Sequence, residues 1–301
     1  MRMRLAKFAA SLALLLLLMW WADAQAVAAR LQEAELAWLA VTLATLTVLT
    51  FVMAKRWQIV TVALDMELPF SRALKEYYIA QLGNMLLPGG VAGDISRAIR
   101  TRHDGDLLRA AQSVAAERVL GQAALFAVTG VAFACALLVP GGIEWPAFAW
   151  LGVAGLCGVA VVAVWLSRGR TAAGRFSRLI LGLMRDPRVV VNSAVVTALV
   201  VFSLYACARA TGTAIPLPAV FTLIPLILSA MLIPLSVGGW GWREGAAAAL
   251  FPLIGASPSA GIAMGIAYGA MMTLAALPAL AILAHSPKVN FLSQIKKRRS
   301  L

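Results

Sequence analysis

Long apolar runs dominate this 301-residue sequence and restrict what it can fold into. A helix needs about 20 residues to cross the ~30 Å hydrocarbon core of a bilayer. Six runs reach or approach that length: Leu5–Trp21, Leu36–Met53, Val119–Val139, Ala147–Leu166, Val189–Ala208 and Ser259–Ala284. Backbone groups in lipid must be hydrogen-bonded within the protein, and the runs lack the two-residue alternation of strands. We therefore predict an all-α integral membrane protein with six transmembrane helices.

The positive charges lie mostly in the connections between these runs and predict an orientation. Lys and Arg number 26 against 13 acidic residues. If the N-terminus is cytoplasmic, only Arg30, Arg209 and Arg243 fall on the outer side, as the positive-inside pattern requires. The inner side then holds Lys55, Arg56, Arg72, Lys75 and the basic residues of 97–118, 168–188 and 288–299. We expect a bacterial-type cytoplasmic (inner) membrane protein with both termini inside, and no nucleic-acid partner.

Both ends of the chain carry a further interpretation. The basic tail Lys296–Arg299 is expected to contact anionic lipid at the cytoplasmic face. The basic start, the run Ser11–Trp21 and the small residues after it also fit a cleavable signal peptide. We expect the N-terminal run to be retained as the first span.

Cysteines and histidines give no sign of a metal site, a disulfide framework or a cofactor. The cysteines lie inside the apolar runs, and the histidines have no Cys or carboxylate ligands at metal-site spacing. These residues are Cys135, Cys157, Cys207, His103 and His285. We expect no bound metal and no cofactor.

Two segments remain outside the six runs, and both are apolar but interrupted by Pro and Gly. The stretch Ile59–Tyr78 mixes apolar and charged residues, which predicts a helix lying at the interface. It leads into segment 79–100, which is divided by the Pro88-Gly89-Gly90 turn and is typical of a re-entrant hairpin from the cytoplasm. Segment 219–258 is predicted to be a second re-entrant hairpin, entering from outside. A pair of fully spanning helices is its alternative.

The two interrupted segments share a pattern. Leu86-x-Pro88-x-x-Val91-x-Gly93-x-x-x-Arg97 has the same spacing as Leu232-x-Pro234-x-x-Val237-x-Gly239-x-x-x-Arg243, 146 residues later. Each half then reads as two spans, a hairpin and a span, inverted across the membrane. We predict one membrane domain, 1–301, made of repeats 1–145 and 146–301. Paired, interrupted segments of this kind indicate a transporter's binding site.

The interrupted segments supply groups that suit an anion. A half-helix that ends inside the bilayer exposes unpaired N–H groups, glycines allow close approach, and an arginine fork fits phosphate. The predicted substrate-binding residues are Asn84, Pro88, Gly89, Gly90, Gly93, Asp94, Arg97, Arg118, Pro234, Gly238, Gly239, Trp242, Arg243 and Glu244. Candidate proton-coupling residues are Asp94, Glu117 and Glu244. The predicted ligand is a lipid phosphate or pyrophosphate headgroup.

Several of these residues have a simpler structural interpretation. Arg97 fits a cytoplasmic anchor, and Asp94 fits a helix cap. Arg243 fits a purely structural pair with Glu244. Glu117-Arg118 fits an interfacial ion pair, and Trp240 and Trp242 fit interfacial anchors.

These motifs resemble a known family. The stretches Asn84-Met-Leu-Leu-Pro-Gly-Gly-Val-Ala-Gly-Asp94-Ile-Ser-Arg97, Glu117-Arg118-x-x-Gly121 and Leu232-Ile-Pro-Leu-Ser-Val-Gly-Gly-Trp-Gly-Trp-Arg-Glu-Gly245 are similar to the flippase-like membrane domain of lysylphosphatidylglycerol synthases. Ala92, where the family usually has Gly, and Trp240, where it more often has Leu, depart from the pattern. The resemblance implies a domain that moves a lipid between leaflets, while a separate soluble domain performs aminoacyl transfer.

The leading hypothesis is therefore a flippase or transporter of a phospholipid or polyprenyl-linked lipid, working by alternating access. No nucleotide-binding Gly-x-x-x-x-Gly-Lys-Ser/Thr motif occurs, so transport is expected to be downhill or ion-driven. One alternative is a scaffold or partner of lipid-modifying enzymes. The less favoured alternative, a lipid aminoacyl transferase, needs a soluble domain that the sequence does not predict, so we do not expect an enzyme.

Overall fold

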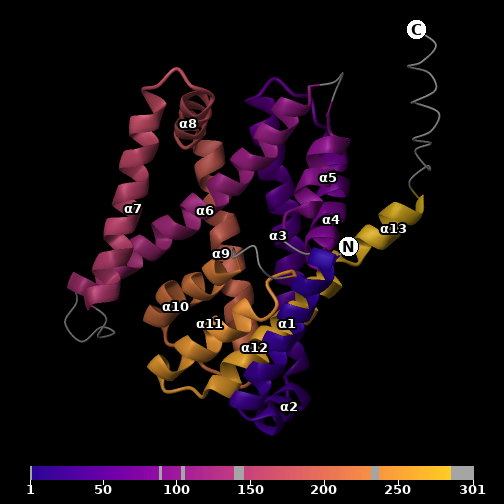
Figure 1. Cartoon of the computed structure of the whole chain (residues 1–301), viewed down its shortest axis with the longest axis vertical. Coiled ribbons are helices and arrows are strands. Elements are labelled where there is room, and N and C mark those ends of the chain that lie inside the picture. Colours follow the sequence, from indigo (N-terminus) through magenta and orange to yellow (C-terminus); the bar gives the residue numbers. More distant parts are fainter. Residues whose placement is uncertain (1, 88–89, 103–105, 139–145, 232–236, 286–301) are drawn as a thin grey trace.

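The structure is a computed structural model that describes residues 2–87, 90–102, 106–138, 146–231 and 237–285. Within these ranges every regular element is helical (Figure 1). The elements are α1 (Arg2–Trp21), α2 (Ala24–Gln32), α3 (Leu36–Val62), α4 (Phe70–Leu86), α5 (Ala92–Arg100), α6 (Leu107–Leu138), α7 (Pro146–Ser167), α8 (Ala172–Leu183), α9 (Pro187–Ala210), α10 (Leu217–Ala230), α11 (Trp242–Leu250), the 3-10 helix η1 (Phe251–Ile254), α12 (Pro258–Ala276) and α13 (Pro278–His285).

Four stretches are long and apolar enough to cross a membrane: Leu36–Val62, Leu107–Cys135, Pro187–Ala210 and Pro258–His285. Each contains or largely overlaps a predicted run. The pair α1 and α2 meets the same criteria only if both are taken together, and it is bent by 96° at its break. Helix α7 covers the remaining predicted run. The prediction of an all-helical, multi-pass membrane protein is therefore confirmed, and four of the six predicted spans are found by this test.

Several helices begin where a polar side chain caps the first turn. The Asp186 carboxylate accepts a hydrogen bond from the Arg188 amide at 2.8 Å, and Pro187 then starts α9. Ser257 caps α12 in the same way, ahead of Pro258. Proline suits the first helical position because its missing N–H would have no helical partner there. These caps define where α9 and α12 start.

The predicted interface helix over Ile59–Tyr78 is wrong. Helix α3 continues to Val62, a turn follows, and α4 begins at Phe70. In the turn, Asp65 has a φ of 54°, and the Met66 amide donates back to the Thr61 carbonyl at 3.0 Å. Pro69 lacks an N–H and disfavours a helical conformation at the residue before it, and α4 begins directly after it.

Helices α4 and α5 form a tight antiparallel hairpin. At one end Gly93 lies against Ala80, because a Cβ on Gly93 would fall 1.9 Å from the Ala80 carbonyl oxygen. At the other end Arg100 forms an ion pair with Glu76 at 2.9 Å. The hairpin therefore depends on glycine at the point where the two backbones meet.

The second interrupted segment also folds back on itself, and it contacts the first. Helices α10 and α11 pack together, and α11 packs closely on α12, where Gly261 meets the backbone of Ala247. A Cβ on Gly238 would lie 3.2 Å from the Met85 carbonyl oxygen. The segment before α11 therefore touches the end of α4 (Figure 1).

The main core lies between α3, α9, α10, α11 and α12, with α3 and α9 in the most extensive contact. Several threonines inside these helices donate hydrogen bonds within their own helix. For example, Thr42 and Thr50 donate to carbonyls four residues earlier, each at 2.9 Å. Such bonding lets hydroxyls lie in apolar surroundings without an unpaired donor.

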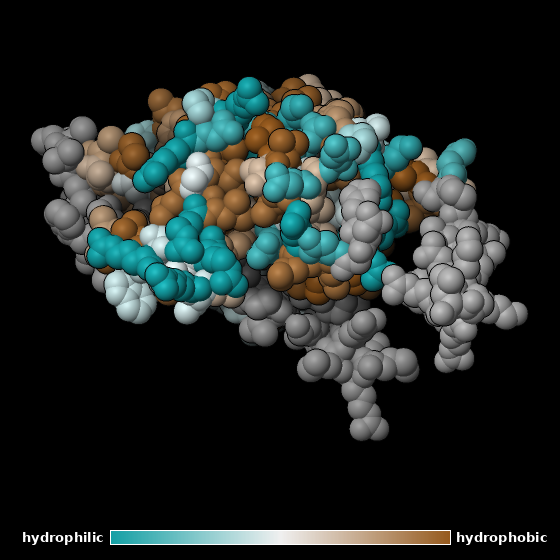
Figure 2. Space-filling model, turned by 90° about the horizontal axis from the view of Figure 1, so that it is seen from above, coloured by the Kyte–Doolittle hydropathy of each residue, from teal (hydrophilic) through white to brown (hydrophobic). Residues whose placement is uncertain are grey.

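Exposed arginines gather at the end of the molecule that is uppermost in Figure 1. Seen from that end, Figure 2 shows hydrophilic residues spread over an otherwise apolar body. The α7–α8 connection, helix α8, the α8–α9 connection and the start of α9 lie there and carry the exposed residues Arg168, Arg170, Arg175, Arg178, Arg185 and Arg188. This clustering matches the predicted cytoplasmic charge.

Candidate functional site

Glu117, on α6, is the centre of a buried ion-pair cluster. Its side chain is 0% exposed. Its Oε1 accepts hydrogen bonds from Arg56 Nη2 at 2.6 Å and Nε at 3.2 Å, and from the Tyr77 hydroxyl at 3.3 Å. Its Oε2 accepts from Arg97 Nη2 at 3.3 Å. One carboxylate therefore ties together α3, α4, α5 and α6.

Asp94, on α5, is the second carboxylate of the cluster. Its Oδ1 accepts from Arg97 Nη2 at 3.1 Å, while its Oδ2 accepts from Arg118 Nη2 and from Asn84 Nδ2 at 3.2 Å. The Asn84 Oδ1 in turn accepts the Gly93 amide at 2.8 Å. Asp94 thus links the end of α4 to the start of α5 and to α6.

Arg97 lies in an aromatic cage. Its guanidinium carbon is 4.3 Å from the centroid of the Trp57 ring and 4.6 Å from that of Tyr77. The Trp57 Nε1 donates to Ser113 at 3.1 Å, which holds the indole in place. Cation–π contacts of this kind stabilise a desolvated guanidinium by about 2 kcal/mol.

Three buried guanidinium nitrogens of the cluster have no hydrogen-bond partner among the described residues. They are Arg97 Nε, Arg97 Nη1 and Arg56 Nη1. A buried donor without an acceptor costs roughly 1–3 kcal/mol, and more when it is charged. Among the described residues, the cluster therefore lacks acceptors for three of its charged donors.

The charge count of the cluster points the same way. Three guanidinium groups (Arg56, Arg97, Arg118) face two carboxylates (Asp94, Glu117), which leaves one positive charge in excess. Arg56 and Arg97 are 2% and 1% exposed, whereas Arg118 is 44% exposed. An unbalanced charge in an apolar environment favours a counter-ion. The partly exposed Arg118 gives an anion a place to enter.

Glycine makes room for this cluster as well. A Cβ on Gly121 would lie 2.8 Å from Arg56 Nη2. Gly121 is one helical turn after Glu117, so the same face of α6 offers the carboxylate and the space for the arginine. The Glu117-Arg118-x-x-Gly121 motif therefore has a packing reason.

A second buried arginine lies in the other half of the chain, at the start of α11. Arg243 and Glu244 are both fully buried. Glu244 Oε1 accepts from Arg243 Nε at 3.1 Å and from Nη2, and its Oε2 accepts the Gly241 amide at 2.6 Å. The pair closes the first turn of the helix on itself.

Arg243 also lies between aromatic rings. Its guanidinium carbon is 5.0 Å from the Trp240 ring centroid and 5.7 Å from that of Tyr268. Gly269 leaves space on α12, since a Cβ there would lie 2.4 Å from Arg243 Nη2. Each half of the chain thus holds one buried arginine that lies between a Trp and a Tyr ring and is hydrogen-bonded to a glutamate.

The structure brings the predicted residues into two separate groups. Asn84, Gly93, Asp94, Arg97, Glu117 and Arg118 belong to the first, and Arg243 and Glu244 belong to the second. Within the described ranges, no hydrogen bond or ion pair joins the groups. Gly90, Gly238 and Gly239 have positive φ in the flanking connections, Trp242 is half-buried at the start of α11, and Pro88, Gly89 and Pro234 lie outside the described residues.

Three of the simpler interpretations do not hold. Arg97 is buried, so it is not a surface anchor. Asp94 does not cap α5, because Val91 occupies that position. Glu117 and Arg118 do not pair with each other, since each bonds to a different partner. The Arg243–Glu244 pair, in contrast, is present.

Sequence reasoning missed Arg56, Trp57, Tyr77 and Tyr268, and for Trp240 it favoured an interfacial anchor over stacking on a headgroup. Arg56 was counted among the connection charges, yet it lies inside α3 and is buried. A basic residue followed by Trp near the end of an apolar run could have signalled a buried pair. Tyr77 and Tyr268 give no such signal, because they lie on other helices, α4 and α12.

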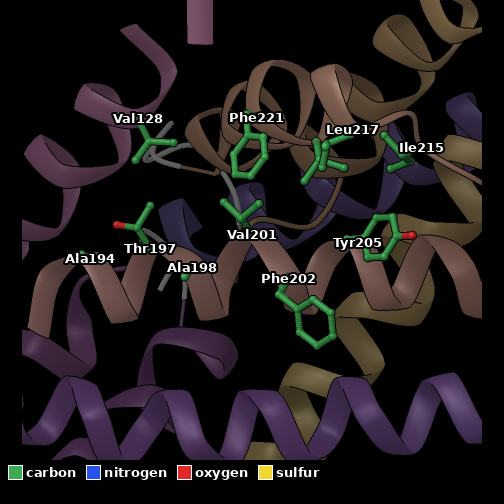
Figure 3. A pocket seen from close by; sticks show the side chains of 11 residues that line it. Val128, Ala194, Thr197, Ala198, Val201, Phe202, Tyr205, Ile215, Leu217 and Phe221 are labelled. Atoms are coloured by element: carbon green, nitrogen blue, oxygen red, sulfur yellow. The ribbon is translucent and has the colours of Figure 1, made fainter. Parts of the chain in front are cut away.

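An apolar groove lies apart from both arginines, between α6, α9 and α10 (Figure 3). Its volume is about 490 Å³. Its only hydroxyls belong to Thr197 and Tyr205, and the Thr197 hydroxyl is engaged by the Ser193 carbonyl at 2.9 Å. Leu217 is 71% exposed, and Phe202 and Phe221 are also exposed, so the groove opens to the outside. Such a groove suits a hydrocarbon chain.

Comparison with known proteins gives the chain a family. A search of curated proteins finds no match. The family described as "Lysylphosphatidylglycerol synthase TM region" matches residues 8–279 and so covers both arginine groups and the groove. The chain therefore belongs to the lysylphosphatidylglycerol synthase TM region family.

Proposed function

We propose that this protein moves a phosphate-bearing lipid between the leaflets of the cytoplasmic membrane by alternating access. The observation that carries the proposal is the buried cluster around Glu117, which holds one guanidinium more than carboxylates and three nitrogens without a partner among the described residues. In a chain made mainly of apolar helices, the anion that such a site meets is the phosphate of a membrane lipid. Arginine binds phosphate through several parallel N–H donors.

The hydrocarbon part of the substrate would lie against the apolar groove. The groove runs along α9 from Ala194 to Tyr205, a stretch of twelve residues and therefore about 16 Å from the first Cα to the last. That length is roughly half of the ~30 Å hydrocarbon core. Its open side would let a lipid chain stay in contact with the bilayer while the phosphate contacts arginine.

The movement would use the two interrupted segments. We propose that α4–α5 and α10–α11 are re-entrant hairpins of an inverted repeat, with the uppermost end of Figure 1 in the cytoplasm. Support comes from the matched Leu-Pro-Val-Gly-Arg spacing, the caged arginine in each half and the contact between Gly238 and Met85. Access to the site would alternate as one repeat rocks against the other.

Lipid movement, rather than lipid aminoacylation, is the activity that this site supports best. The cluster offers charge and hydrogen-bond donors for recognition, and the groove offers an apolar wall. All three predicted proton carriers are in ion pairs, but Glu117 and Glu244 are fully buried, whereas the Asp94 side chain is 11% exposed. Asp94 is therefore the residue that we propose for proton coupling, if transport is ion-driven.

Translocation of a fluorescent phospholipid in proteoliposomes tests the proposal. Arg97→Ala is expected to slow translocation about tenfold or more, because a charge-assisted hydrogen bond contributes about 1.5–3 kcal/mol. Arg109→Ala is the matched control, since Arg109 lies on the same side in an exposed pair with Asp106 at 2.8 Å. The proposal would be contradicted if a well-folded Arg97→Ala protein moved the lipid as fast as Arg109→Ala does. It would also be contradicted if the unmodified protein moved no lipid.

A further inference from the structure

We infer that the two arginines held between aromatic rings have different functions: Arg97 exchanges partners to take the lipid phosphate, and Arg243 stays locked in its pair. The inference rests on the proposed function and departs from the symmetry of the repeat. It follows from the donors and partners of each guanidinium.

Arg97 has donors to spare. Only its Nη2 forms hydrogen bonds, at 3.1 Å to Asp94 and 3.3 Å to Glu117, and its Nε and Nη1 are unpartnered among the described residues. Both contacts are long for charge-assisted bonds, which are usually 2.7–2.9 Å. Neither carboxylate therefore holds the Arg97 guanidinium in a short, two-donor ion pair.

Both carboxylates that contact Arg97 also have a closer arginine. Glu117 is bound by Arg56 at 2.6 Å, and Asp94 is bound by Arg118 at a shorter distance than by Arg97. If a phosphate drew Arg97 away, neither carboxylate would be left without a cation. Transfer of Arg97 onto a phosphate would therefore leave both carboxylates neutralised.

Arg243 has no such freedom. It binds Glu244 through both Nε and Nη2, and no second Lys or Arg contacts Glu244 within the described residues. Movement of Arg243 would leave a fully buried carboxylate with only the Gly241 amide. Separating a buried pair in this way is strongly unfavourable.

This difference assigns a positioning role to Arg56. Its Nε and Nη2 keep Glu117 neutralised, so that Arg97 can leave. Gly121 provides the space that Arg56 needs beside Glu117. Arg56→Gln would leave Arg97 as the closest cation of Glu117 and so hold Arg97 in place.

The two cages provide their own reporters, because each contains a tryptophan. In protein labelled with 5-fluorotryptophan, the fluorine NMR signals of Trp57 and Trp240 can be assigned from Trp57→Phe and Trp240→Phe. The probe is dihexanoyl phosphatidylglycerol, added to the full chain in uncharged detergent, and the control is dihexanoylglycerol, which lacks the phosphate. We expect a saturable shift of the Trp57 signal with the phosphatidylglycerol alone, and no shift of Trp240.

Two variants test the role of Arg56. Arg56→Gln is expected to weaken the apparent affinity read from Trp57 about tenfold, and Arg56→Gln/Glu117→Gln is expected to restore most of it. A merely structural role of Arg56 would instead disturb the Trp240 signal as well, or give no recovery in the double variant. Either result would overturn the positioning role.

The outcomes separate this inference from the proposed function. A shift of Trp240, equal shifts of both signals, or a Trp57 response to dihexanoylglycerol would overturn the inference. Lipid translocation without any Trp57 shift would overturn it too, while leaving the proposed function intact. A Trp57 shift in a protein that moves no lipid would support the anion site and contradict transport.

Discussion

Glu117→Ala is expected to lower the free energy of unfolding by about 3–5 kcal/mol, because it leaves two buried arginines without their shared carboxylate. Arg56 and Arg97 are 2% and 1% exposed, so water cannot replace the lost acceptor. The Tyr77 hydroxyl loses its acceptor at the same time. Thermal unfolding of the purified protein in detergent measures the effect as a fall in Tm.

Two further variants isolate the cause. Glu117→Gln keeps the shape and one acceptor oxygen, so its loss reports the missing charge. Glu67→Ala changes an exposed glutamate in the turn between α3 and α4. It should change the free energy of unfolding by no more than about 0.5 kcal/mol and so leave Tm nearly unchanged. Equal Tm values for Glu117→Ala and Glu67→Ala would show that the cluster does not stabilise the fold.

Gly93→Ala is expected to push α5 away from α4. Because Asp94 and Arg97 lie on α5, this shift is expected to disrupt their ion pairs in the cluster. The new Cβ would lie 1.9 Å from the Ala80 carbonyl oxygen and 2.8 Å from its Cα, and these are backbone atoms that cannot rotate away. Overpacking usually costs about 1–3 kcal/mol, and a contact this short places the change at the upper end. The hydrogen bond from the Gly93 amide to Asn84 would lengthen as α5 moves.

The matched change is Gly182→Ala in α8, where an added Cβ meets nothing within 4 Å. Alanine there should be neutral or slightly stabilising, because it favours the helix. Thermal unfolding of both variants, with the Trp57 signal as a local probe, gives the comparison. If Gly93→Ala matches Gly182→Ala in Tm and leaves Trp57 unmoved, the described packing of α4 on α5 is incorrect.

Hydropathy predicted the membrane helices well because one physical requirement decides them. A spanning segment must be apolar and about 20 residues long, and that can be read from consecutive residues. The same approach failed between α3 and α4. There the mixed composition suggested an interface helix, whereas Pro69 and the conformation of Asp65 make a turn.

The arginine cluster was only partly predictable. Asp94, Arg97 and Glu117 stood out because charge is rare in apolar sequence. Arg56 did not, since a basic residue at the end of a span is usually an orientation signal. Its partner Glu117 lies 61 residues away on another helix, so only packing reveals the pair.

The structure also changes what the repeat means. Matched spacing suggested two equivalent arginines facing one ligand. The hydrogen bonds instead give Arg97 unused donors and Arg243 a closed pair. Similar sequence patterns can therefore place the same residue type in two different electrostatic situations.

The most direct test of the central claim is native mass spectrometry of lipid retained by the purified protein. The account predicts that the unmodified protein carries phosphate-bearing lipid and that Arg97→Ala loses most of it, whereas Arg109→Ala retains it. Equal lipid retention by Arg97→Ala and the unmodified protein would contradict the assignment of the cluster as the phosphate site.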